Sequence, residues 1–166
     1  MPKGLDWEFV LKRGVLAIAP KYDQGIGDTT HILLFGGENL CVRRNILTVL
    51  KNLGKYYMLD LAECRRYYAE FLGRRKNLPM VYNEENIFVP VRTRQPIGKN
   101  DGAMSFVNYR FVQGVEDSDV IFTDGSRMES FSAHITISNN LRDAGHILKD
   151  LRQKAEKEKR RTGRAV

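Results

Sequence analysis

Short apolar runs separated by turn residues occupy the first 35 residues, a pattern typical of β-strands. Residues 7–19 predict two strands joined by a turn, and Pro20 ends the second of them. Residues 20–28 are rich in glycine and aspartate and predict a loop. Residues 29–35 predict a further strand, which the pair Gly36-Gly37 closes as a turn.

The pattern changes to a helical period after residue 45. Apolar residues recur three and four positions apart at Ile46, Val49, Leu50 and Leu53. Gly54 stands where a glycine often ends a helix. A second helix is predicted to begin at Asp60, which forms a D-x-x-E capping box with Glu63, and to stop at Gly73.

Strand patterns return in the C-terminal half. Three strands are predicted, at residues 79–82, 87–91 and 104–115. Pro90 belongs at a sheet edge or a bulge, because proline has no N–H to donate to a neighbouring strand. Residues 119–133 predict a hairpin, since Asp124-Gly125 between apolar runs is typical of a type I′ turn.

The chain ends in a helix followed by a charged segment. The last helix is predicted to begin at a Ser138 cap, and its apolar stripe continues to Leu151. We therefore expect one domain over residues 1–153 and a basic, disordered tail over residues 154–166. The order of the elements predicts an α+β fold, with a mainly antiparallel β-sheet, two central helices and a C-terminal helix.

Positive charge is concentrated in two stretches of the 166-residue chain. Residues 43–76 hold nine Lys and Arg against three Asp and Glu, and residues 149–166 hold eight against three. Since the whole chain has a net charge of +7, the remainder is net acidic. Clustered positive charge is typical of proteins that bind polyanions. A solvated surface with an incidental basic tail is the alternative.

Several classes of protein find no support in the sequence. No apolar stretch is long enough to span a membrane, and we expect a cytoplasmic protein. Cys41 and Cys64 are too few for a disulfide framework and predict free buried thiols. The three histidines lack paired metal-ligand spacing, and no nucleotide-binding or nucleophile motif is present. We expect neither an enzyme nor a cofactor or metal site.

Arginines and amides around residues 92–110 are candidates for contacting nucleic acid. Five candidates occupy the long loop after the strand at 87–91: Arg92, Thr93, Arg94, Lys99 and Asn100. Five more are the helix-end cations Arg74, Arg75 and Lys76, and the residues Asn108 and Arg110. Arginine offers a planar fork for phosphates and guanine edges, and amides can bond to base edges. A hairpin connection without function, and cations that suit a helix C-terminus, are the alternatives.

Several phrases in the chain resemble the family of the bacterial competence transcription factor ComK. The segments that carry the resemblance are VLAIAPKYD from Val15, the K-x-x-P phrase at Lys76–Pro79, the phrase with Phe88, Pro90 and Thr93, and the stretch from Met104 to Leu141. A fainter similarity joins Arg92, Arg94, Val107-Asn108, Val112 and Asp124-Gly125-Ser126 to LytTR DNA-binding domains.

Both resemblances imply a mainly β domain that docks on duplex DNA through loops. The ComK resemblance implies a sequence-specific transcriptional regulator, an activator of the competence type, that binds AT-rich double-stranded DNA. It further implies a homo-oligomer on repeated half-sites and a regulatory protein partner. In this hypothesis the residues after Arg92 read bases, Arg74–Lys76 contact phosphates, and Asn108 and Arg110 support the loop or add contacts. A protein-interaction adaptor and an RNA- or single-strand-binding protein are the other hypotheses.

Overall fold

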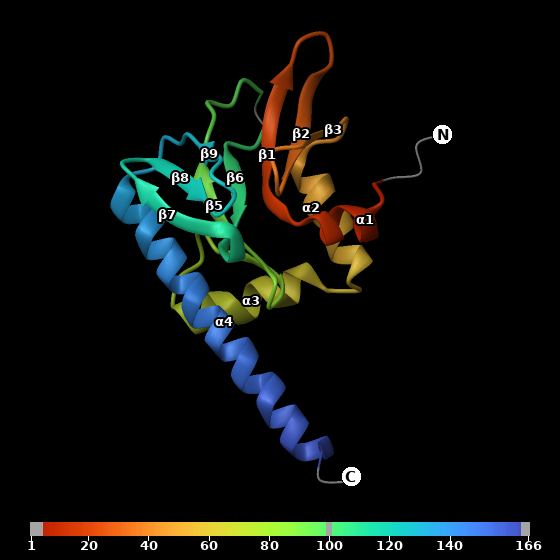
Figure 1. The fold of residues 1–166 in the computed structure, drawn as a ribbon, viewed down its shortest axis with the longest axis vertical. Coiled ribbons are helices and arrows are strands. Elements are labelled where there is room, and N and C mark those ends of the chain that lie inside the picture. Colours follow the sequence, from red (N-terminus) through yellow and green to blue (C-terminus); the bar gives the residue numbers. More distant parts are fainter. Residues whose placement is uncertain (1–4, 99–100, 164–166) are drawn as a thin grey trace.

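Six antiparallel strands form the central sheet of the computed structural model, which describes residues 5–98 and 101–163 (Figure 1). The strands are β1 Val15–Asp23, β2 Gly27–Leu34, β3 Asn39–Val42, β4 Met80–Asn83, β5 Asn86–Arg92 and β6 Met104–Asn108. Their order across the sheet is β3-β2-β1-β6-β5-β4. A smaller antiparallel sheet has the order β7-β8-β9, with β7 Val112–Glu116, β8 Asp119–Phe122 and β9 Arg127–Met128.

Four α-helices and a short 3-10 helix complete the described part of the chain. They are α1 Trp7–Arg13, α2 Ile46–Tyr56, α3 Leu61–Leu72, η1 Tyr109–Phe111 and α4 His134–Gly163. The α+β fold with a mainly antiparallel sheet, two central helices and a C-terminal helix is confirmed. None of the helices within these residues is long and apolar enough to cross a membrane.

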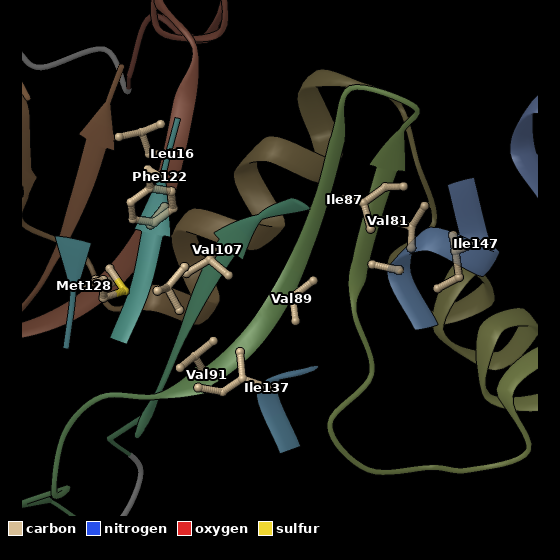
Figure 2. Close-up of a cluster of buried hydrophobic side chains, with 14 of the residues drawn as sticks. Leu16, Val81, Ile87, Val89, Val91, Val107, Phe122, Met128, Ile137 and Ile147 are labelled. Carbon is tan, nitrogen blue, oxygen red and sulfur yellow. The ribbon is translucent and has the colours of Figure 1, made fainter. Parts of the chain in front are cut away.

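The large sheet has a hydrophobic core on each face. On one face, Ile18 and Phe88 pack with residues of α1 and α2. On the other face, the side chains of β5 and β6 pack with α4 and the small sheet (Figure 2). Val91 and Ile137 are both fully buried in this second core. Helices α2 and α4 therefore lie on opposite faces of the sheet.

The predicted second helix has the ends that its sequence specifies. The side chain of Asp60 accepts a hydrogen bond from Glu63 N at 3.1 Å, and Gly73 has the left-handed conformation that ends a helix. The first predicted helix also forms, with Asn45 as its N-cap. Gly54 does not end it, because α2 continues to Tyr56 and Gly54 is buried inside it.

The N-terminal segment differs from the prediction. Residues 7–13 form the helix α1 instead of a strand, because Asp6 caps it and Trp7 and Val10, three positions apart, both enter the core. Pro20 does not end a strand, since β1 continues to Asp23 and pairs there with the start of β2. Most of the predicted loop at residues 20–28 is thus strand, and only residues 24–26 form the turn.

Pro90 and the Asp124-Gly125 turn show how proline and glycine fit the sheets. The last pair between β4 and β5 is Met80 with Phe88, so Pro90 lies beyond the strand that would have needed its N–H, as predicted. The hairpin of β8 and β9 forms around Asp124-Gly125, but only Gly125 has a positive φ there. A type I′ turn needs two such residues, so the predicted turn type is wrong, and the loop is longer by one residue.

Helix α4 begins earlier and ends later than predicted. It starts at His134 because Ile137, one position before the predicted cap Ser138, is fully buried in the core. Residues 154–163, which we expected to be disordered, are helical. Pairs one turn apart, such as Lys154 with Asp150 at 3.3 Å, support this extension. In Figure 1 the C-terminal part of α4 extends beyond the sheets.

Candidate nucleic-acid interface

Helices α3 and α4 lie against each other and bring the two basic stretches together. Tyr67 Oη donates a hydrogen bond to Asp150 Oδ2 at 3.1 Å, and Lys154 Nζ lies 3.7 Å from the centre of the Tyr67 ring. Arg74 pairs with Asp143, which lies about two turns closer to the start of α4 than Asp150 does. The residues around 65–76 and the middle of α4 therefore share one side of the molecule.

Arg74 fixes the turn that follows α3. Its Nε donates to Lys76 O at 3.1 Å, and its Nη2 donates to Asn77 O at 3.0 Å. The same guanidinium pairs with Asp143 and contacts Asn140 Oδ1 at 3.3 Å. Arg74 is therefore occupied by contacts within the protein, and it holds the turn against α4. Its neighbours Arg75 and Lys76, predicted with it to contact phosphates, have exposed side chains.

Two neighbouring hollows form a surface that we call the α3–α4 basic surface. One hollow, of about 660 Å³, is lined by residues that include Arg65, Arg66, Glu70, Arg74 and Arg75. The other, of about 470 Å³, is lined by Arg74, Arg75, Lys76, Asn77, Thr136, Asn139 and Asn140. Because the two share Arg74 and Arg75, they adjoin each other.

The α3–α4 basic surface has an excess of positive charge. Five cations and one carboxylate line the two hollows. Arg66 pairs with Glu63, but Arg75 and Lys76 are exposed and form no ion pair with any residue that the structure describes. The first turn of α4 holds no acidic residue, so its free N–H groups add to the attraction for an anion.

The small sheet has the opposite charge. Residues 112–133 contain five Asp and Glu against a single Arg. One of these carboxylates, Glu116, pairs with that residue, Arg127. A polyanion would therefore be attracted to the side with α3 and repelled from the side with β7–β9.

Arg92 is exposed at the end of β5, close to the start of α4. Its backbone N–H donates to Ser132 Oγ at 2.9 Å, and its carbonyl accepts from Phe131 N at 2.7 Å. The Arg92 side chain forms no ion pair within residues 5–98 and 101–163. The neighbouring Thr93 is half-buried, with its Oγ1 2.5 Å from Ser105 Oγ. Of the loop arginines, Arg92 is the one available to a partner.

Arg94 is buried, and its position does not suit it to contact DNA. Its Nη2 lies 2.8 Å from Asp28 Oδ1, its Nε donates to Gly102 O at 2.5 Å, and its guanidinium lies 4.0 Å from the centre of the Tyr22 ring. The Arg94–Asp28 contact does not have the geometry of a hydrogen bond, but the two opposite charges attract each other at this distance. Arg94 therefore anchors the loop to the end of the β1–β2 hairpin.

The loop itself is held by Tyr22 and Asp101. Tyr22 Oη donates to Asp101 Oδ2 at 2.6 Å and accepts from Ile97 N at 2.6 Å. The hydrogen bonds from Tyr22 and from the Gly98 N–H lower the pKa of the Asp101 carboxyl. Lys99 and Asn100, predicted to read bases, lie outside the described residues.

Neither Asn108 nor Arg110 lines the α3–α4 basic surface. Asn108 is fully buried, and its Nδ2 donates to Val15 O at 3.0 Å and to Asn86 Oδ1 at 3.2 Å. Arg110 pairs with Glu85 at 2.8 Å at the other end of β5 from Arg92. Strand β5 rises roughly 3.3 Å per residue, so Arg92 lies about 20 Å from the end of β5 that is next to Glu85. Both residues serve the fold in these positions.

Sequence reasoning missed part of the surface and misplaced one cysteine. Thr136 and Asn139 enter the α3–α4 basic surface because α4 begins at His134 and not at Ser138. Cys41 is exposed on β3, while Cys64 is half-buried on α3, so Cys41 is not the buried thiol that we predicted. An apolar stripe traced back to Ile137 could have found the start of α4.

Comparison of the chain with models of known protein families, with curated proteins and with solved structures gives no match in any of the three. The fold and the α3–α4 basic surface therefore define the class of molecule by themselves: an α+β domain with one cationic, polar surface and one acidic sheet.

Proposed function

We propose that the protein binds duplex DNA as a transcriptional regulator of the ComK-like type in the bacterial cytoplasm. The observation that carries this proposal is the α3–α4 basic surface, in which five cations from residues 65–76 and polar side chains from the first turns of α4 line two adjoining hollows. The resemblance of several segments to the ComK family supports it. An enzyme is not favoured, because the surface offers cations and amides instead of a nucleophile with its base.

The α3–α4 basic surface contacts the phosphate backbone in this proposal. Arg65, Arg75 and Lys76 are exposed and donate to phosphate oxygens, and the N-terminal turn of α4 adds its free N–H groups. Asn139 lines the same hollow and can bond to a phosphate or a base edge. Such contacts fix the position of a protein on DNA without selecting a sequence.

Arg92 selects the sequence in this proposal. Its side chain is exposed beside the segment that leads into α4. Arginine is favoured in the narrow, strongly negative minor groove of AT-rich DNA. Arg94, buried at the other side of the loop, positions the residues that follow and does not touch DNA. Binding as a homo-oligomer to repeated half-sites, and control by a regulatory protein, follow from the resemblance.

A protein-interaction adaptor is the second candidate function. Phe131 and Ile135 are 63% and 65% exposed directly before and within the first turn of α4. Exposed apolar side chains of this size are typical of protein-binding surfaces. They also serve DNA binding, since minor-groove proteins insert apolar side chains between base steps. Salt dependence separates the two functions.

A fluorescence-anisotropy titration with AT-rich and GC-rich duplexes tests the proposed function. Each duplex is titrated at about 50 mM and about 200 mM salt, because each neutralised phosphate releases counterions. Neutralisation of three phosphates by Arg65, Arg75 and Lys76 predicts an affinity loss of about 40-fold over this range. We expect tighter binding to the AT-rich duplex at both salt concentrations.

Three outcomes would contradict the proposal. Absence of binding at low micromolar protein in the lower salt would favour the adaptor. Binding that ignores salt would exclude contact through the cationic surface, whichever duplex is used. Binding to single-stranded DNA that exceeds duplex binding, and that depends on the exposed Tyr67, would favour a single-strand-binding protein.

A further inference from the structure

Three strands bring an aspartate, a histidine and a cysteine to one point at the edge of the large sheet. In the pairing of β1 with β2, Ala19 lies opposite His31, and the pairing continues to Asp23 at the end of β1. In the pairing of β2 with β3, His31 lies opposite Cys41. Asp23 lies opposite Gly27, and its side chain reaches along the strands to contact both His31 and Cys41.

The ligand atoms of these three residues lie close to one another. Asp23 Oδ2 is 2.8 Å from His31 Nε2 and 3.3 Å from Cys41 Sγ, and all three atoms lie within 4.8 Å of one another. Ligands around a tetrahedral Zn²⁺ ion are about 3.3–3.6 Å apart, given bond lengths of roughly 2.0–2.3 Å. Small side-chain rotations would bring the atoms to these separations.

We propose that Asp23, His31 and Cys41 bind one Zn²⁺ ion. Carboxylate, imidazole and thiolate are the three ligand types that zinc takes from proteins. No other group of three or more such side chains converges in this way in the part of the chain that the structure describes. The ion would hold β1, β2 and β3 together at the open end of the sheet.

The chemistry of the cluster favours a metal site over a catalytic one. The hydrogen bonds from Thr29 and His31 lower the pKa of Asp23 to about 2, so the carboxylate is ionised at neutral pH. Partial desolvation of the thiol and the neighbouring Asp23 raise the pKa of the exposed Cys41, which therefore is a poor nucleophile. His31 Nε2 faces the carboxylate and is not positioned as a base for the thiol.

The same features set how the ion binds. The thiol loses its proton on binding, so affinity rises with pH through the neutral range. Cys41 is exposed and the Asp23 side chain is 29% exposed, which leaves room for a water as the fourth ligand. His31 Nδ1 has no hydrogen-bonding partner among the described residues, and the lack of such a partner weakens a site about 10- to 100-fold. We therefore expect micromolar affinity.

Titration of the untagged, metal-free protein with Co²⁺ tests the site, because Co²⁺ occupies zinc sites and its absorption reports a bound thiolate. We expect a sulfur-to-cobalt charge-transfer band that saturates at one equivalent and disappears when Zn²⁺ is added. Cys41→Ser should abolish the band. Cys64→Ser, which changes the other cysteine on α3, is the matched control and should keep it.

Three results would overturn the proposal. The first is the absence of a band in the wild-type protein, and the second is a band that persists in Cys41→Ser. Circular dichroism establishes that each variant is folded. Should Cys41→Ser not fold, His31→Gln tests the site in its place, because it keeps the thiol and removes the imidazole. A band that still saturates at one equivalent of Co²⁺ in His31→Gln would likewise exclude the site.

Discussion

Replacement of Arg94 separates an anchor of the fold from a DNA contact. Arg94→Ala removes the ion pair with Asp28, the hydrogen bond to Gly102 O and the contact with the Tyr22 ring. Loss of one partner of a buried ion pair costs about 3–5 kcal/mol, because the other charge is left unpaired. The Asp28 side chain is 21% exposed and keeps some solvation, so we expect the lower end, about 3 kcal/mol.

Urea and thermal unfolding, followed by circular dichroism, measure this loss. For a chain of this size, about 3 kcal/mol lowers Tm by about 6–12 °C. Arg94→Lys keeps the charge but not the planar guanidinium, and its free energy of unfolding should lie between those of the wild type and Arg94→Ala. Arg92→Ala is the matched control, because an exposed residue outside any ion pair changes stability by about 0.5 kcal/mol or less.

The DNA affinities of the two variants complete the test. Arg92→Ala should weaken binding to its AT-rich site by about 1–3 kcal/mol while the protein stays as stable as the wild type. Equal unfolding midpoints for Arg94→Ala and Arg92→Ala would refute the anchoring role of Arg94. A loss of DNA affinity in Arg94→Ala alone, at temperatures where it is fully folded, would show that the two arginines have been given the wrong roles.

Four further predictions concern stability and the end of α4. Gly54→Ala should destabilise the protein by about 1 kcal/mol in urea unfolding, because its Cβ would lie 2.9 Å from Leu61 Cγ and overpacking outweighs the gain in helix propensity. Asp60→Ala should cost about 1 kcal/mol in the same assay through the lost cap. The lowered pKa of Asp23 stabilises the folded state above pH 4, and this contribution is lost as the pH falls through about 2. Asp23→Asn should therefore flatten the dependence of the urea midpoint on pH between about 4 and 2. An unchanged dependence would contradict this role of Asp23. Deletion of residues 155–166 should lower anisotropy-measured affinity equally for AT-rich and GC-rich duplexes, and a changed preference would contradict an unspecific role.

Local signals predicted the elements whose ends are set by nearby residues. Helix α3 begins at Asp60 and ends at Gly73 because the cap and the left-handed glycine act within one turn. Helix α1 was missed because its residues alternate nearly as well as they follow a helical period, and burial of Trp7 and Val10 in the core decides between the two. Its seven residues gave too short a pattern to distinguish them.

The candidate interface depended on contacts that the sequence does not reveal. Arg92 and Arg94 are two positions apart and look equivalent, but Asp28 and Tyr22 from the first hairpin bury one of them. In the same way, Arg74 is occupied by α4 while its neighbours are free. The clustering of positive charge in the sequence predicted that cations contact a polyanion, but not which of them are exposed. Only the packing of α3 on α4 shows which of them a partner can reach.

The strand register explains why the Asp23–His31–Cys41 cluster was missed. These residues are eight and ten positions apart, a spacing that matches no metal-binding motif. Only the pairing of His31 with Cys41 across β2 and β3, and the continuation of β1 to Asp23, brings them together. Since the prediction ended the strand at Pro20, Asp23 was assigned to a loop.

A pair of charge-matched variants tests the central claim most directly. Arg75→Ala/Lys76→Ala removes two cations from the α3–α4 basic surface, and Lys51→Ala/Lys55→Ala removes two exposed cations from α2, on the opposite face of the sheet from α4. Duplex affinity is measured by anisotropy over a series of salt concentrations. We predict that the first variant binds about tenfold more weakly, with a salt slope reduced by about two, while the second binds as the wild type does. Equal losses in the two variants would contradict the account, because net charge alone, and not this surface, would then attract DNA.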